Sequence, residues 1–186
     1  MNYATFWQRF SAMWIDIFVF VPIGVVQLFI EGHSKLVAMV LIVPMTALGL
    51  GYHIYCHGRF GKTLGKHAMG IRVVRLDGTP IGWPEAWKRS SVDVVFALAN
   101  VVAMFIALST ISDASYYDVP LADRARNIQA MQPEWAVAVQ IAINIWVWSE
   151  VVVMLFNERR RALHDFIAGT IVVSDRVSIP VESKPA

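Results

Sequence analysis

Charged residues are scarce in this sequence. Asp, Glu, Lys and Arg make up 16% of its 186 residues, whereas 56% are hydrophobic and the mean hydropathy is +0.52. Soluble domains carry about 25% charged residues, so this chain has too little polar surface to face water on all sides. The shortage excludes an ordinary soluble protein and indicates a membrane protein. The small net charge of +2 does not point to nucleic acid as a partner.

Cysteine is also nearly absent, and with it most metal and redox chemistry. The single Cys56 excludes an internal disulfide and a zinc site built on a cysteine pair. His53 and His57 have the spacing of two metal ligands on a helix, but no third ligand accompanies them. Gly61-Lys62-Thr63 lacks the earlier glycine of a phosphate-binding loop, because Cys56 stands at that position. We therefore expect no metal, no cofactor and, without a nucleophile grouping, no enzyme.

Long apolar runs dominate what is present. A helix needs about 20 apolar residues to span a bilayer, and four segments reach that length: residues 10–30, 36–56, 91–111 and 135–156. The first is too long for a signal peptide and contains Asp16, so we expect it to be retained. The sequence predicts an all-α membrane protein with four transmembrane helices. We assign residues 1–175 to this transmembrane domain and residues 176–186 to a polar, flexible tail.

The basic residues are unevenly placed between the spans. Only Lys35, Arg124 and Arg126 fall on one side, and the other thirteen Lys and Arg residues fall on the opposite side. The positive-inside rule therefore predicts that both termini and the loop of residues 56–90 are cytoplasmic. The basic tail segment of residues 159–161 is expected to contact anionic lipid headgroups.

The long cytoplasmic loop is predicted to be structured. Residues 71–81 are rich in β-branched side chains around Asp77-Gly78, a pair typical of a β-hairpin turn. Residues 61–70 are basic with interspersed apolar positions, which favours an amphipathic segment along the membrane surface.

Two of the predicted spans carry a stripe of polar side chains. The stripe in the first span consists of Arg9, Asp16 and Gln27, and that in the third of Arg89, Asp93 and Asn100. Each set recurs on one helix face, since seven residues turn a helix by about 700° and eleven by about 1100°. A charge facing lipid at mid-membrane costs about 3 kcal/mol. The two stripes are therefore expected to face each other or a hydrated cleft.

Arg9 and Asp16 share a face but lie at different depths. Their separation along the helix axis is about 10.5 Å, and helical side chains lean toward the N-terminus. We therefore expect Arg9 to bind a cytoplasmic carboxylate, with Asp165 as the candidate. Asp16 is expected to contact Arg89, a water or a backbone donor of another element.

Asp16, Asp93 and Glu150 all fall in the cytoplasmic half of their spans. Such a cluster fits a proton- or cation-accessible site that opens inward. It fits equally well a set of polar contacts that join the helices. Both interpretations stay open at this point.

Three ordered blocks of the chain resemble the RDD family of bacterial membrane proteins. They are R-F-S-A-M-W-I-D at residues 9–16, G-K-T-L-G-K-H-A-M-G-I-R-V-V-R-L-D-G-T-P-I at residues 61–81, and A-L-H-D-F-I-A-G-T-I-V-V at residues 162–173. The resemblance implies that the arginine and two aspartates for which the family is named are Arg9, Asp16 and Asp165. Gln8 and Phe166 stand where many members have a basic residue. The resemblance also implies a location in the bacterial cytoplasmic (inner) membrane.

Two functional hypotheses follow. A transport role, including cation/proton exchange, has been proposed for some members of that family; here Asp16 would titrate, Arg9 and Arg89 would tune it, and Asp165 would organise the cytoplasmic gate. Four spans are few for a carrier, so this hypothesis implies a homo-oligomer. The alternative is a non-catalytic membrane assembly or accessory protein in which the Arg and Asp residues are structural.

Overall fold

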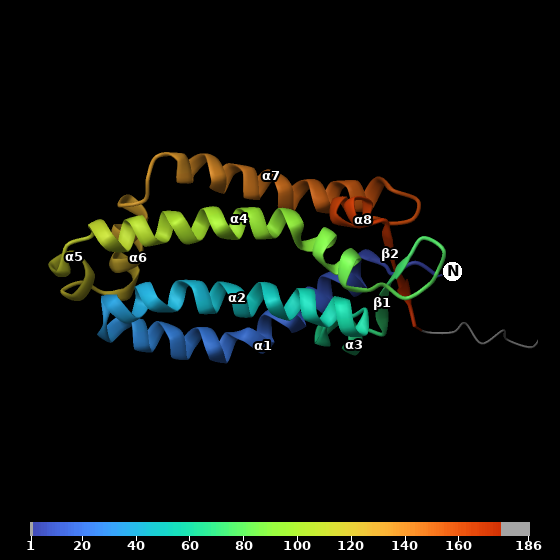
Figure 1. Ribbon diagram of the computed structural model, residues 1–186, viewed down its shortest axis with the longest axis horizontal. Helices are drawn as coiled ribbons and strands as arrows, with labels where there is room; N and C mark the ends of the chain where they lie inside the picture. The colour runs from blue at the N-terminus through green and yellow to red at the C-terminus, as the bar shows by residue number, and fades with distance from the viewer. Residues whose placement is uncertain (1, 176–186) are drawn as a thin grey trace, which may run out of the picture.

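The computed structural model describes residues 2–175, and the predicted flexible tail of residues 176–186 lies outside the described residues. Four helices in the described part are long and apolar enough to cross a membrane, which confirms the predicted number of spans. They are α1 (Phe6–His33), α2 (Lys35–Phe60), α4 (Trp83–Thr110) and α7 (Trp135–Phe156). All four run along the long axis of the molecule (Figure 1).

The helices extend beyond the predicted apolar segments because capping residues define their ends. The Thr5 hydroxyl accepts a hydrogen bond from the Gln8 N–H, and the Gln8 side chain accepts one from the Thr5 N–H, so α1 begins at Phe6 rather than at residue 10. At α4, the Glu85 carboxylate accepts a hydrogen bond from the Gly82 N–H and starts the helix eight residues before the predicted span. The first turns of both helices thereby reach into one end of the molecule.

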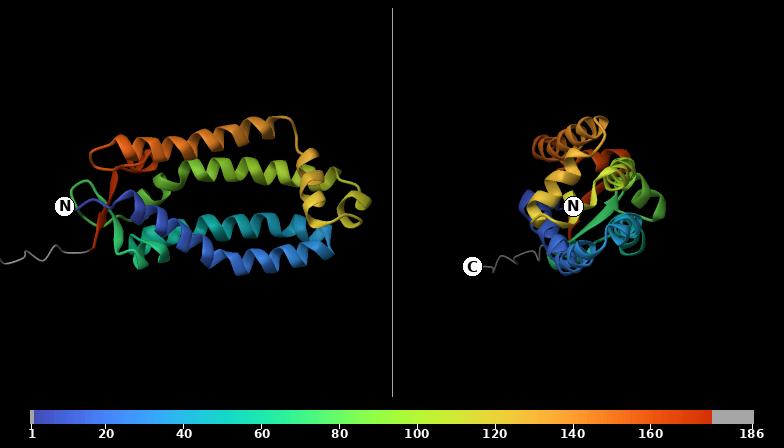
Figure 2. Two further views of the ribbon diagram at one scale, coloured as in Figure 1. Left: turned by 180° about the vertical axis from the view of Figure 1, so that it is seen from behind. Right: turned by 90° about the vertical axis from the view of Figure 1, so that its left-hand side faces the viewer.

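The short elements gather at the two ends of the bundle. At one end lie the N-terminal residues together with α3 (Leu64–Ala68), β1 (Ile71–Arg75), α8 (Leu163–Ala168) and β2 (Thr170–Ser174), and at the other lie α5 (Asp113–Tyr117) and α6 (Leu121–Ala130) (Figures 1 and 2). The chain therefore starts its first span and finishes its last at the same end, which we call the basic end after its Lys- and Arg-rich loop. Placement of the basic end in the cytoplasm stays a prediction.

The sheet at the basic end pairs segments that are distant in sequence. β1 and β2 are antiparallel, with Val73 opposite Val172. The turn predicted at Asp77-Gly78 is present and brings Pro80 to a bridge with Val74, but the ladder of β1 is formed with β2. The physical reason is that β2 supplies apolar side chains to both faces, whereas Pro80 has no N–H to donate. The prediction of a turn at Asp77-Gly78 is thus confirmed. The prediction that β1 pairs mainly within this hairpin is wrong, because its main partner is β2.

The four long helices form an open arc rather than a closed bundle. α2 packs on α1 and on α4, and α4 packs on α7, so α1 and α7 are the two edges of the arc (Figure 2, right). α3 packs on α1, and α8 packs on α4 and α7. The basic segment predicted to lie along the membrane surface is therefore docked on the first span through α3.

Candidate functional site

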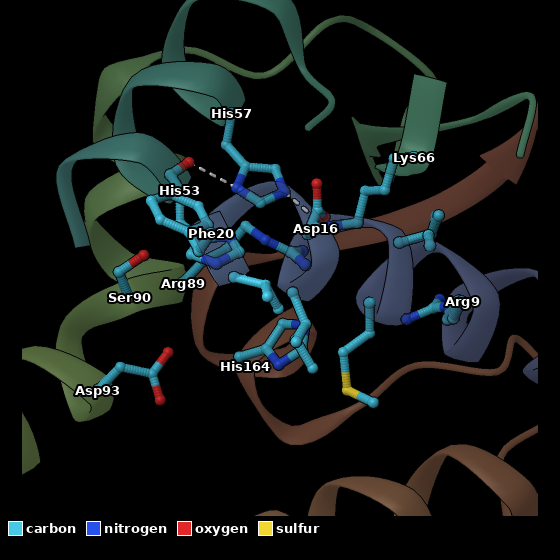
Figure 3. Close-up of a pocket in the computed structure, with 15 residues that line it drawn as sticks. Arg9, Asp16, Phe20, His53, His57, Lys66, Arg89, Ser90, Asp93 and His164 are labelled. Atoms are coloured by element: carbon cyan, nitrogen blue, oxygen red, sulfur yellow. Dashed lines mark hydrogen bonds between the residues drawn. The ribbon is translucent and has the colours of Figure 1, made fainter. Parts of the chain in front are cut away.

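A cavity of about 640 Å³ lies at the basic end, inside the arc of helices (Figure 3). Its polar lining consists of Arg9, Asp16, His53, His57, Lys66, Arg89, Ser90, Asp93 and His164. Four of these belong to the two polar stripes, so the stripes of α1 and α4 face a common cavity, as predicted. The remaining stripe residues, Gln27 and Asn100, line a second cavity of about 390 Å³ that also contains Tyr116 and Arg124.

Asp165 pairs with two arginines at the basic end. Its side chain is fully buried, and Arg9 donates to its Oδ2 from Nη1 at 2.8 Å. Arg89 pairs with the other oxygen, Oδ1, and also donates to the Thr170 hydroxyl at 2.6 Å. The Ala162 N–H donates to Oδ2 at 3.0 Å. The predicted partner of Arg9 is therefore found, whereas Arg89 binds Asp165 and not Asp16.

The charge of Asp165 is maintained by these neighbours. Burial alone would raise the pKa of its carboxyl group, but the positive charges of Arg89, His164 and Arg9 hold that pKa well below its ordinary value. Asp165 joins α8 and β2 to α1 and α4 through these contacts.

Asp16 has a different environment, made of neutral donors. It accepts hydrogen bonds from the Tyr52 hydroxyl at 2.7 Å, the Thr63 hydroxyl at 2.6 Å and the Gly65 N–H at 2.8 Å. The backbone donor was among the predicted alternatives, and the two hydroxyls were not. A side chain at Gly65 would lie 2.0 Å from the Ala12 carbonyl oxygen, so only glycine permits this approach. Asp16 therefore anchors α3 to α1.

Lys66 was not predicted as a site residue, yet it lines the polar side of the cavity (Figure 3). Its Nζ lies 2.6 Å from Nε2 of His57, whose Nδ1 lies 2.7 Å from the His53 carbonyl oxygen. A carbonyl can only accept, so Nδ1 carries the hydrogen and Nε2 accepts from Lys66. Burial and the nearby charge of Arg89 lower the pKa of Lys66 to about 7. Lys66 lies in the block of residues 61–81 that resembles the RDD family, but the resemblance did not single it out.

The other two intramembrane acids are separated. Asp93 lines the cavity beside Ser90, on the side away from Lys66 (Figure 3). Glu150 instead contacts His164, accepting from its backbone N–H at 2.9 Å and lying 2.6 Å from its Nδ1. Glu150 therefore helps to hold α8 against α7.

Comparison with known proteins identifies the family. The model of the RDD family matches residues 3–169, a range that contains Arg9, Asp16 and Asp165. Searches among curated proteins and among solved structures give no match. Since the match covers nearly the whole chain, this protein belongs to the RDD family.

Proposed function

We propose that this multi-pass membrane protein has a proton-linked transport role centred on the cavity at the basic end. The observation that carries the proposal is the contact of Lys66 with His57 inside a cavity that also receives polar side chains of α1 and α4. By the positive-inside rule, this cavity opens on the cytoplasmic side of the bacterial inner membrane. Because four spans are few for a carrier, the role implies a homo-oligomer.

The proposed proton site is Lys66 rather than Asp16. An ammonium group with a pKa of about 7 exchanges its proton over a small change in pH, and each exchange changes the cavity charge by one. The charged and titratable groups that act on Lys66 come from four elements: Arg9 and Asp16 of α1, His57 of α2, Arg89 of α4 and Asp165 of α8. Asp16 has both carboxylate oxygens occupied by donors and serves to position α3, which carries Lys66.

The cation in this proposal is the proton. A metal cation needs several acceptor side chains around one point, and residues 2–175 contain no group of three His, Cys, Asp or Glu side chains placed to hold one. The basic side chains of the cavity would also repel a metal cation.

A second candidate function, a non-catalytic assembly or accessory role, is favoured by Asp165. This buried carboxylate bridges Arg9 and Arg89 and so joins the first span, the third span and the C-terminal elements. Such an ion-pair bridge is what a purely structural contact between the helix ends would require. In that case removal of Asp165 would lower the folded yield, and there would be no flux to lose.

Proton flux in liposomes distinguishes the two functions. The full-length protein is reconstituted with phosphatidylglycerol-containing lipids and a pH-sensitive dye, and a pH gradient is imposed with the membrane potential clamped. We expect the wild type to accelerate proton movement, Lys66→Met to abolish the acceleration, and Lys88→Met to retain it. Lys88 is an exposed residue of α4 and provides the matched loss of one charge. Wild-type flux equal to that of protein-free liposomes would refute the transport role, and full flux in Lys66→Met would refute the assignment of Lys66 as its proton site.

A further inference from the structure

The buried guanidinium of Arg9 has two N–H donor groups without an acceptor among the described residues. Its side chain is only 10% exposed, and Nη1 is taken by Asp165. Its Nε and Nη2 atoms are buried and have no hydrogen-bond partner among the described residues. These two N–H groups lie side by side on a planar guanidinium, the arrangement that binds two oxygens of a phosphate or carboxylate. Unsatisfied buried donors of this kind call for an acceptor.

The charges around Arg9 favour an anion as that acceptor. Lys66 and Arg89 line the same cavity, as do His53, His57 and His164. The nearby carboxylates are already occupied, since Asp16 accepts from neutral donors, Asp165 pairs with both arginines and Glu150 accepts from the His164 N–H. Asp93 also lines the cavity, on the side away from Lys66 (Figure 3). Among the described residues, no carboxylate accepts a hydrogen bond from Lys66 or from Nε and Nη2 of Arg9.

Part of the cavity lining is apolar and belongs to α1, an edge helix of the arc. Met13, Ile17 and Val21 of α1 line the cavity and are also 47%, 44% and 47% exposed at the molecular surface. α1 is an edge of the open arc, so an exposed side chain on its apolar length contacts lipid. The cavity is thus open laterally to the acyl chains of the membrane, a feature that a site for a water-soluble ion does not require.

From this combination we infer that the cavity binds an anionic phospholipid. The phosphate would accept hydrogen bonds from Nε and Nη2 of Arg9 and from the ammonium of Lys66. One acyl chain would leave along Met13, Ile17 and Val21 between the edges of the arc. The inference rests on the proposed function and deepens it, because it names the class of ligand that the proton-linked site would move or respond to.

Proton uptake and lipid binding are coupled at this site. The protonated form of Lys66 pairs with the phosphate, and the pKa of this lysine is about 7 in the empty cavity. Lipid affinity should therefore fall as the pH rises from about 6 to about 8.5, across that pKa. Reciprocally, a bound phosphate favours protonation of Lys66.

The test is a binding measurement on the full-length protein in a neutral detergent, without any gradient. Binding of dioctanoyl-phosphatidylglycerol, dioctanoyl-phosphatidylcholine and inorganic phosphate is followed by native mass spectrometry and by tryptophan fluorescence. We expect phosphatidylglycerol to bind at least tenfold more tightly than phosphatidylcholine. Inorganic phosphate at the same concentrations should not compete, because it lacks the acyl chain.

Three variants assign the site. Lys66→Met should weaken phosphatidylglycerol binding about tenfold, the effect of one charge-assisted hydrogen bond, and Lys88→Met should stay within twofold of the wild type. Arg9→Lys keeps a positive charge opposite Asp165 but removes both unpartnered donors, and should also weaken binding about tenfold. If Lys66→Met does not elute as a folded species, Arg9→Lys decides the question.

Several outcomes would overturn the inference. They are equal affinity for the two lipids, competition by inorganic phosphate at the same affinity, or wild-type binding in a folded Lys66→Met or Arg9→Lys protein. Failure here is separable from failure of the proposed function. A protein that binds phosphatidylglycerol at this site but moves no protons refutes transport alone, whereas flux without lipid binding refutes only the lipid site.

Discussion

Replacement of Gly65 by alanine should detach α3 from the first span. The added Cβ would lie 2.0 Å from the Ala12 carbonyl oxygen and 2.9 Å from Cγ of Asp16, whereas ordinary contact begins at 3.4 Å. The nearer obstacle is backbone and cannot rotate away, so α3 must retreat by about 1.4 Å. The 2.8 Å hydrogen bond from the Gly65 N–H to Asp16 would then stretch beyond hydrogen-bonding distance.

The magnitude follows from the contacts that are lost. A hydrogen bond to a charged group contributes about 1.5–3 kcal/mol, and overpacking of a rigid contact costs about 1–3 kcal/mol. A retreat of α3 breaks the hydrogen bond but relieves part of the overpacking, so the two costs do not add in full. We therefore expect Gly65→Ala to lower the free energy of unfolding by about 2–4 kcal/mol.

The assay is unfolding of the purified protein in mixed micelles with increasing SDS, followed by tryptophan fluorescence. Gly24→Ala is the matched control, since Gly24 lies on α1 and a Cβ added there would have nothing within 4 Å. This control should gain up to about 1 kcal/mol in helix propensity. Equal unfolding free energies for Gly65→Ala and Gly24→Ala would refute the anchoring role assigned to the Gly65 contact.

The remaining predictions concern the ion pairs of Asp165 and the titration of Lys66. Asp165→Asn leaves buried arginine charge uncompensated and should destabilise the protein by about 3–5 kcal/mol; unchanged SDS unfolding would contradict this. Thr170→Val removes one acceptor of Arg89 and should cost a smaller amount, about 1–2 kcal/mol, so a loss as large as that of Asp165→Asn would argue against our ranking. The pKa of Lys66 is about 7 in the native state, against an ordinary value of 10.5. Below pH 7 the native protein therefore carries the full cost of a buried ammonium, and between pH 7 and about 10.5 it gains stability as that proton leaves. Lys66→Met should raise the melting temperature most near pH 6 and least near pH 10, whereas a pH-independent gain, or the same profile in Lys88→Met, would exclude Lys66 as the titrating group.

The sequence was sufficient for the spans and for the facing stripes, because both depend on local periodicity. Apolar length predicted each of the four long helices, and helical spacing placed Arg9, Asp16, Arg89 and Asp93 on faces that meet in one cavity. The contact of Arg9 with Asp165 could also be predicted, because the position of Arg9 at the end of its span favoured a carboxylate outside the span as its partner.

The sequence was insufficient where contacts depend on tertiary approach. Asp16 is bound by Thr63 and Gly65 because a glycine allows two backbones to touch, and no periodicity reports such an approach. The same docking carries Lys66 into the cavity, although its sequence context is typical of an exposed basic loop. Likewise, local turn signals at Asp77-Gly78 could not reveal that β1 would pair with a strand almost a hundred residues away.

The ion pair between Arg9 and Asp165 also imposes an order on biosynthesis. The two residues are 156 positions apart, and ribosomes add about 5–20 residues per second, so Arg9 waits roughly 8–30 s for its counterion after it has been made. During that interval its membrane helix is already in the bilayer, and headgroups or the insertion machinery must balance its charge. A nascent chain that stalls before Asp165 therefore holds Arg9 without its native counterion.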